Sequence, residues 1–150
     1  MKNSIEIGFQ EKKITITPLE YEFKGTNDSY DANWLNVKVQ ILHENINYSI
    51  VDPFILTTEL QELLNWFNEV DDTDGNKTFE FLESGMKIEF NKKEADFSFI
   101  FTWNLHPFGV DYYSRTNQDF VIKFNKVELD INNIVSQISL LITEFPTIKF

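Results

Sequence analysis

The sequence predicts a single α+β domain over residues 1–150, a mainly antiparallel sheet of about eight strands with two amphipathic helices packed on it. Apolar residues alternate with polar ones through most of the chain, which is typical of half-buried strands. In two segments they recur instead at helical spacing. At 150 residues, 42% of them hydrophobic, the chain can bury one substantial core, and no linker or internal repeat divides it.

The N-terminal third is expected to form two β-hairpins. Apolar residues alternate over 5–9 and 14–23, and again over 34–41 and 46–50, with short polar turns within each pair. Pro18 interrupts the second of these strands. Because proline cannot donate to a strand ladder, we expect an edge strand or a β-bulge at this position.

The first helix is predicted over residues 58–70, where the period of the apolar residues changes. Thr57 or Thr58 can cap its N-terminus, and Thr58 with Gln61 fits a capping box. The polar run 71–76 is too turn-prone to continue the helix. The apolar face consists of Leu60, Leu63, Leu64 and Phe67.

The C-terminal half predicts more strands and a second helix. Phe97, Phe99, Phe101 and Trp103 are expected to share one face of their strand. A helical stripe of apolar residues over 131–145 ends at Pro146. The strands are predicted at 79–82, 86–90, 96–103 and 120–124.

Charge and composition restrict the partners and the compartment. Thirteen basic and 24 acidic residues give a net charge of -11, which opposes binding to nucleic acid or anionic membranes and suits a basic partner. The absence of cysteine rules out disulfides and thiolate metal sites. Neither a signal peptide nor an apolar run long enough to span a membrane is evident, so a cytoplasmic protein is expected.

The acidic residues are unevenly placed. No lysine or arginine occurs between Val39 and Asn76, so the first helix and its exit loop are expected to be strongly negative. Such a face can attract a basic partner over a long range, or it can be a solvated helix surface. The candidate partner-binding residues are Glu59, Glu62, Glu69, Asp71, Asp72 and Asp74.

Residues that could support catalysis are scarce. His43 and His106 have neither a carboxylate nor a second histidine at ligand spacing, and the chain contains no nucleophile elbow and no glycine-rich phosphate loop. We therefore expect a protein that is not an enzyme and uses no metal or cofactor. A hydrolase using Asp28 or Asp31 with His106 is the remaining catalytic alternative.

An aromatic pocket offers an alternative function. If the sheet and helices enclose the aromatic strand, the protein could be a small intracellular ligand-binding or scaffold protein. The expected pocket lining is Phe97, Phe99, Phe101, Trp103 and Tyr112.

Three stretches carry a family resemblance: YDANWLNV at 30–37, DPFILTTEL at 52–60 and LLNW at 63–66. Together with the order of the later elements, they resemble the WapI-type immunity proteins of bacterial contact-dependent toxin systems. The resemblance covers most of the chain in layout. Its sharpest part consists of Asp31, Asn33, Trp34 and Leu35, followed by Thr57, Glu59 and Leu60.

The resemblance implies a non-enzymatic cytoplasmic protein that binds and blocks a cognate toxin domain encoded beside it. Such toxins are often nucleases with basic surroundings of the active site, which agrees with the acidic balance of this chain. The residues of the motif are expected to be structural. Asp31 and Asn33 suit a turn fixed by side-chain to backbone hydrogen bonds, and Trp34 and Leu35 suit the core.

Overall fold

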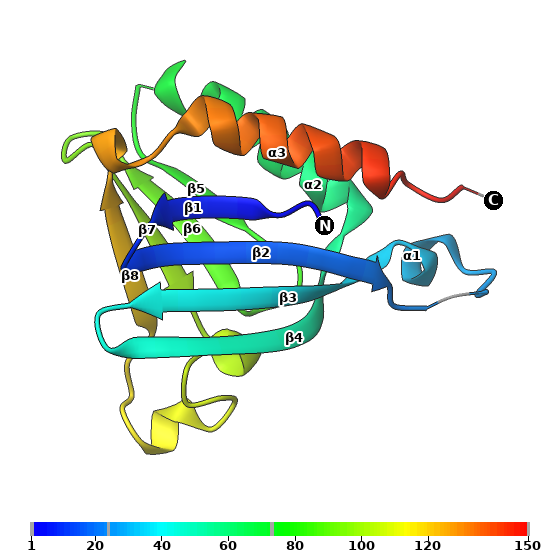
Figure 1. Ribbon diagram of the computed structural model, residues 1–150, viewed down its shortest axis with the longest axis horizontal. Coiled ribbons are helices and arrows are strands. Elements are labelled where there is room, and N and C mark those ends of the chain that lie inside the picture. The colour runs from blue at the N-terminus through cyan, green and yellow to red at the C-terminus, as the bar shows by residue number, and fades with distance from the viewer. Residues whose placement is uncertain (1, 24, 73, 150) are drawn as a thin grey trace.

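The computed structural model describes residues 2–23, 25–72 and 74–149, with the side chains of residues 29 and 30 left out. Two antiparallel sheets of four strands each and two long helices make up the fold, which confirms the α+β class (Figure 1). Within the described residues, no helix has both the length and the apolar character needed to cross a membrane.

The N-terminal sheet has the strand order β1-β2-β3-β4, so each strand pairs with its neighbour in sequence. The predicted β-bulge at Pro18 is confirmed, because the pairing of β2 with β3 shifts between Pro18 and Glu20. The pairing of β1 with β2 ends at Ile16, so Pro18, which has no N–H to donate, does not interrupt the hydrogen bonds between these two strands. The strands are β1 (Ile5–Phe9), β2 (Lys12–Tyr21), β3 (Trp34–His43) and β4 (Ile46–Leu56).

The second sheet has the order β5-β6-β7-β8 and its strands run across those of the N-terminal sheet (Figure 1). The predicted strand at 96–103 ends early, because Trp103 adopts a positive φ of 50° and turns the chain out of the sheet. The strands are β5 (Lys77–Glu80), β6 (Met86–Asn91), β7 (Asp96–Phe101) and β8 (Phe120–Asn125).

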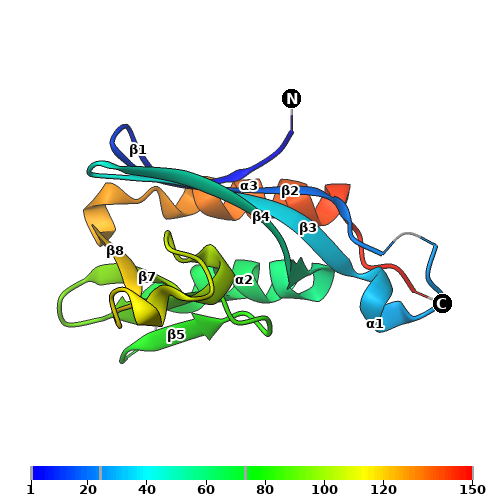
Figure 2. The same cartoon turned by 90° about the horizontal axis from the view of Figure 1, so that it is seen from below.

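Helix α3 (Ile131–Glu144) runs alongside β1 at the edge of the N-terminal sheet (Figure 1), and α2 (Thr57–Glu69) packs against α3 and is level with β7 when the molecule is seen from below (Figure 2). Both were predicted within a residue of these bounds. In α3, Ile134, Ile138 and Leu141 are buried, and the Asp130 side chain caps the helix by accepting from the Asn133 N–H. The short elements are α1 (Ser29–Ala32), η1 (Val70–Asp72), η2 (Trp103–Leu105), η3 (Tyr112–Ser114) and η4 (Lys126–Glu128).

One continuous apolar core joins the sheets and helices. The rings of Trp66 and Phe67 on α2 lie 6.1 and 6.3 Å from the ring of Phe97 on β7. Phe54 at the end of β4 meets Phe81 edge to face at 5.4 Å. Helix α2 therefore packs against the second sheet while its first residue continues directly from the N-terminal sheet.

Candidate functional site

The candidate acidic residues fall into an exposed group and one buried residue. Glu62 on α2, Asp71 and Asp72 on η1, and Asp74 are exposed, as is Glu69 at the end of α2. We call these five side chains the acidic surface. They lie along one helix and its exit turn, as the sequence predicts.

Lysines from distant parts of the chain neutralise part of the acidic surface. Lys126 on η4 lies 2.6 Å from an Asp71 carboxylate oxygen, and Lys77 on β5 lies 3.3 Å from Glu69. Lys92 donates to the Asp71 backbone carbonyl at 3.4 Å. These lysines lie after the lysine-free stretch in sequence, and the folding of the second sheet brings them next to it. Counting the charges within the stretch therefore misses them.

Glu59 does not belong to the acidic surface, because its side chain is buried with only 4% of the residue exposed. One carboxylate oxygen accepts from the Leu56 N–H at 2.9 Å and the other accepts from the Leu82 N–H at 2.7 Å. Glu59 thereby joins the start of α2 to the end of the β5 segment. This contact also corrects the expected cap, since Leu56 is the N-cap residue and Glu59 makes the reciprocal bond assigned to Gln61.

Burial raises the pKa of Glu59, although the two backbone N–H donors oppose that shift. A carboxyl whose pKa is higher in the folded than in the unfolded chain stabilises the fold most when it is protonated. Its contribution to stability is therefore complete below the ordinary value of 4.5 and declines as the pH rises through the folded-state pKa.

Glu59→Gln is expected to lower the free energy of unfolding by about 1–3 kcal/mol, because one buried backbone N–H loses its acceptor. The difference in the free energy of unfolding between Glu59→Gln and the wild type should increase as the pH falls from neutral to below 4.5, where Glu59 is protonated in the wild type. Urea unfolding at several pH values measures both effects. Glu62→Gln, one turn along the exposed side of α2, is the matched control. If the stability difference between Glu59→Gln and the wild type instead decreased toward low pH, the assigned direction of the pKa shift of Glu59 would be contradicted.

Asn33 holds the C-terminal tail against the start of α2. Its side-chain N–H donates to the Ile148 carbonyl at 2.9 Å, and its Oδ1 accepts from the Ile148 N–H at 2.7 Å. The Thr57 hydroxyl donates to the same Oδ1 at 3.0 Å, and the Thr57 N–H donates to the Asn33 carbonyl. Two motif residues, Asn33 and Thr57, thus meet each other and a third segment from the end of the chain.

The other motif residues are also part of the framework. Trp34 and Leu35 are buried, as expected. The expected turn bond is corrected, since the Asp28 side chain accepts from the Asp31 N–H rather than Asp31 acting as acceptor. Asp31 itself is half-buried beside this turn.

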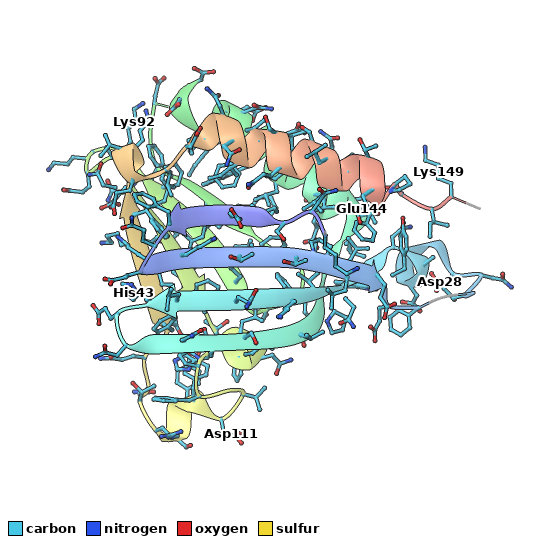
Figure 3. The ribbon with its side chains drawn as sticks, viewed as in Figure 1. Asp28, His43, Lys92, Asp111, Glu144 and Lys149 are labelled. Atoms are coloured by element: carbon cyan, nitrogen blue, oxygen red, sulfur yellow. The ribbon has the colours of Figure 1, made fainter. Side chains whose placement is uncertain are left out.

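His106 is buried and both of its ring nitrogens contact backbone groups. Its Nδ1 accepts from the Phe108 N–H at 3.0 Å, and Nε2 lies 3.0 Å from the Gln118 carbonyl. Burial lowers the pKa of His106, which favours the neutral ring that these contacts require. The loop that carries His106, marked by Asp111, lies apart from Asp28 (Figure 3). The proposed pairing of His106 with Asp28 or Asp31 is therefore wrong.

The expected aromatic pocket is wrong as well. Phe97, Phe99 and Phe101 show no exposed area, and they fill the core against α2 and β8. Tyr112 is buried in the loop that follows β7, and Trp103 in the same loop is 44% exposed. The aromatic strand is a core element.

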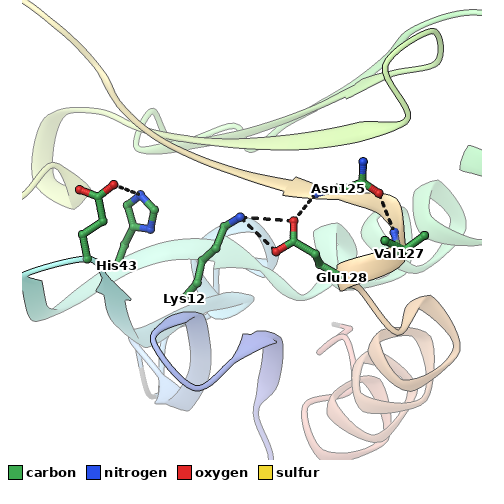
Figure 4. Close-up of polar contacts among 6 residues, drawn as sticks. Lys12, His43, Asn125, Val127 and Glu128 are labelled. Carbon is green, nitrogen blue, oxygen red and sulfur yellow. Dashed lines mark hydrogen bonds and ion pairs between the residues drawn. The ribbon is translucent and has the colours of Figure 1, made fainter.

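The turn between β8 and α3 is attached to the N-terminal sheet by Lys12 and Glu128 (Figure 4). Their charged atoms lie 3.3 Å apart, and Glu128 also accepts from the Asn125 N–H at 2.7 Å. That backbone bond, with help from Lys12, lowers the pKa of Glu128. His43 lies nearby at a strand end, 3.8 Å from Glu44, as expected of an ordinary strand-end residue. Within residues 2–23, 25–72 and 74–149, no group of three His, Cys, Asp or Glu side chains is arranged so that it could bind a metal ion.

The geometry therefore describes an α+β fold in which the polar side chains of the motif hold separate segments together. The model of the WapI-like immunity protein family matches residues 5–146, nearly the whole chain. The chain belongs to this family of immunity proteins. It matches no curated protein and no solved structure.

Proposed function

We propose that this protein is a non-enzymatic immunity protein that binds a cognate toxin domain and blocks it. The family match over residues 5–146 is the observation that carries the proposal. The structural role of the motif supports the proposal. The polar groups of Asn33, Thr57 and Glu59 form hydrogen bonds within the protein and hold separate segments together. The protein would act in the cytoplasm.

The acidic surface suits the attraction of a basic toxin domain, such as a nuclease. Glu62, Asp72 and Asp74 are exposed, whereas the described contacts of Lys77, Lys92 and Lys126 with the acidic surface are made to Glu69 and Asp71. The net charge of -11 favours a basic protein over nucleic acid or an anionic membrane. Charges of this kind act mainly by steering the encounter, so the acidic surface would raise the association rate.

Co-expression tests the function directly. Bacteria that produce the toxin domain encoded beside this gene should grow only when they also produce this chain, and the tagged chain should retain the toxin domain during purification. An unrelated neighbouring gene, or a toxin that kills despite abundant folded chain, would overturn the proposal.

Reversing two exposed charges, Glu62→Lys with Asp72→Lys, is expected to slow association with the toxin domain about tenfold at low salt. Added salt should weaken the wild-type complex more than the complex of this variant. Stopped-flow association at several salt concentrations gives both values. The matched control reverses two exposed acidic residues elsewhere, Glu11→Lys with Glu44→Lys, and changes the net charge equally.

The control variant is expected to slow association much less, because its charges lie at turns of the N-terminal sheet. Both variants should unfold within about 0.5 kcal/mol of wild type, as exposed substitutions usually do. Equal rates for the two variants would place the steering charge elsewhere while leaving the immunity function intact.

A further inference from the structure

The segment 102–119 between β7 and β8, which we term the aromatic loop, is held in place by internal contacts and by one contact to β4. The rings of His106 and Tyr112 stack with centroids 4.0 Å apart inside it. The Tyr112 hydroxyl donates to Asp119 at 2.8 Å. The Tyr48 hydroxyl on β4 donates to the Leu105 carbonyl at 2.7 Å and attaches the loop to the N-terminal sheet.

This buried framework presents large apolar side chains to solvent. The Trp103 and Tyr113 rings lie edge to face at 5.7 Å and are 44% and 48% exposed. Phe108 and Val110 are exposed to a similar degree. Exposed aromatic and apolar side chains held together on a fixed support are typical of protein interaction sites, where tryptophan and tyrosine often dominate the binding energy.

A pocket of about 210 Å³ opens beside Trp103. It is larger than a cavity of roughly 150 Å³ that accommodates a benzene molecule. Glu80 and Asp119 line it together with Trp103 and Lys87, and the Lys87 ammonium group lies 3.2 Å from Glu89. An indole ring with two carboxylates favours a guanidinium or ammonium group, through cation–π and charge-assisted contacts.

We propose that the aromatic loop is the anchoring surface for the toxin, and that an arginine or lysine side chain of the toxin enters the pocket between Trp103, Glu80 and Asp119. This inference rests on the proposed immunity function and adds a binding surface that differs from the acidic surface. Lys92, which borders the acidic surface, and Asp111, in the aromatic loop, lie at opposite edges of the view in Figure 3.

The two surfaces have different kinetic roles. The acidic surface acts at a distance and sets the association rate, whereas buried aromatic contacts set the dissociation rate. Trp103→Ala should therefore weaken toxin binding about 10- to 100-fold, mainly by faster dissociation. Glu80→Gln should also weaken binding by removing one carboxylate from the pocket.

The matched control is Phe9→Ala, which removes another exposed aromatic side chain far from the loop in sequence. It should leave the affinity unchanged. Because Trp103 is 44% exposed and lies outside the continuous apolar core, the melting temperature of Trp103→Ala should stay close to that of the wild type, which separates lost binding from lost folding.

A direct test of the contact uses ¹⁹F NMR of the chain labelled with 5-fluorotryptophan, to which the unlabelled toxin domain is added. The chain has three tryptophans, of which Trp34 and Trp66 are buried. The Trp103 signal, assigned by its loss in Trp103→Phe, should shift when the complex forms. Unchanged signals in a complex that forms would overturn the anchoring surface and leave the immunity function standing. Failure of the wild type to bind or protect would overturn both.

Discussion

Leu141→Ala is expected to lower the free energy of unfolding by about 2–5 kcal/mol, the usual cost of emptying a leucine site in a core. Leu141 lies on α3 with no exposed area, within the continuous apolar core. The melting temperature should fall by roughly 2–4 °C for each kcal/mol lost in a chain of this length. Urea unfolding and thermal melting measure the effect.

The matched control is Leu140→Ala, the neighbouring residue on the same helix, whose side chain is 56% exposed. It should change stability by less than about 0.5 kcal/mol. Gln137 is unsuitable as a neutral control despite its polar character, because its Oε1 accepts from the Glu6 N–H on β1 at 2.8 Å. Similar small losses at Leu140 and Leu141 would mean that α3 is not packed on the core in solution.

Asn33→Ala is expected to cost about 1–3 kcal/mol, because it removes the partners of a buried hydroxyl and of two backbone groups at once. The amide hydrogen of Ile148 should then exchange with solvent much faster, since its bond to Asn33 is lost. Hydrogen exchange followed by NMR reports this site specifically.

Asn47→Ala is the matched control, because Asn47 is exposed on the edge strand β4. It should alter neither the stability nor the exchange of Ile148. Slow exchange of Ile148 in Asn33→Ala would show that the tail is held by other contacts. The motif would then need a different explanation.

Most of the fold was predictable because burial alternates as the residue pattern does. In β3, Val37, Val39 and Ile41 are buried while Lys38 and Gln40 face outward. The same alternation of apolar and polar residues is visible in the sequence. Helices α2 and α3 were found for the same reason, through their helical spacing. Periodicity reports which face of an element is apolar, and it does so without information about neighbours.

The errors arose where a distant part of the chain decides the outcome. The role of Glu59 depends on the Leu82 N–H, 23 residues away, so its charge suggested a surface residue. Trp103 continues the alternating pattern of the aromatic strand in the sequence, yet its backbone adopts a positive φ and leaves the sheet. The lysines that meet Asp71 and Glu69 come from β5, η4 and the β6–β7 turn.

The functional surface was harder to predict than the fold for a related reason. The motif at Asn33 and Thr57 could be recognised in sequence, but its third partner, Ile148, carries no distinctive signal. The aromatic loop likewise depends on the stacking of His106 with Tyr112 and on the attachment to β4 through Tyr48. Tertiary contacts, which a local pattern does not encode, create both features.

The bond between Asn33 and Ile148 joins residues 115 positions apart, and the bond from Glu6 to Gln137 spans 131 positions. Closing contacts of such separation carries a large loop entropy and comes late in folding. During synthesis, the N-terminal sheet can form its hairpins while α3 and the tail are still inside the ribosome. The core can close only after α3 and the segment through Ile148 have left the ribosome, so the nascent chain exposes apolar surface until those residues emerge.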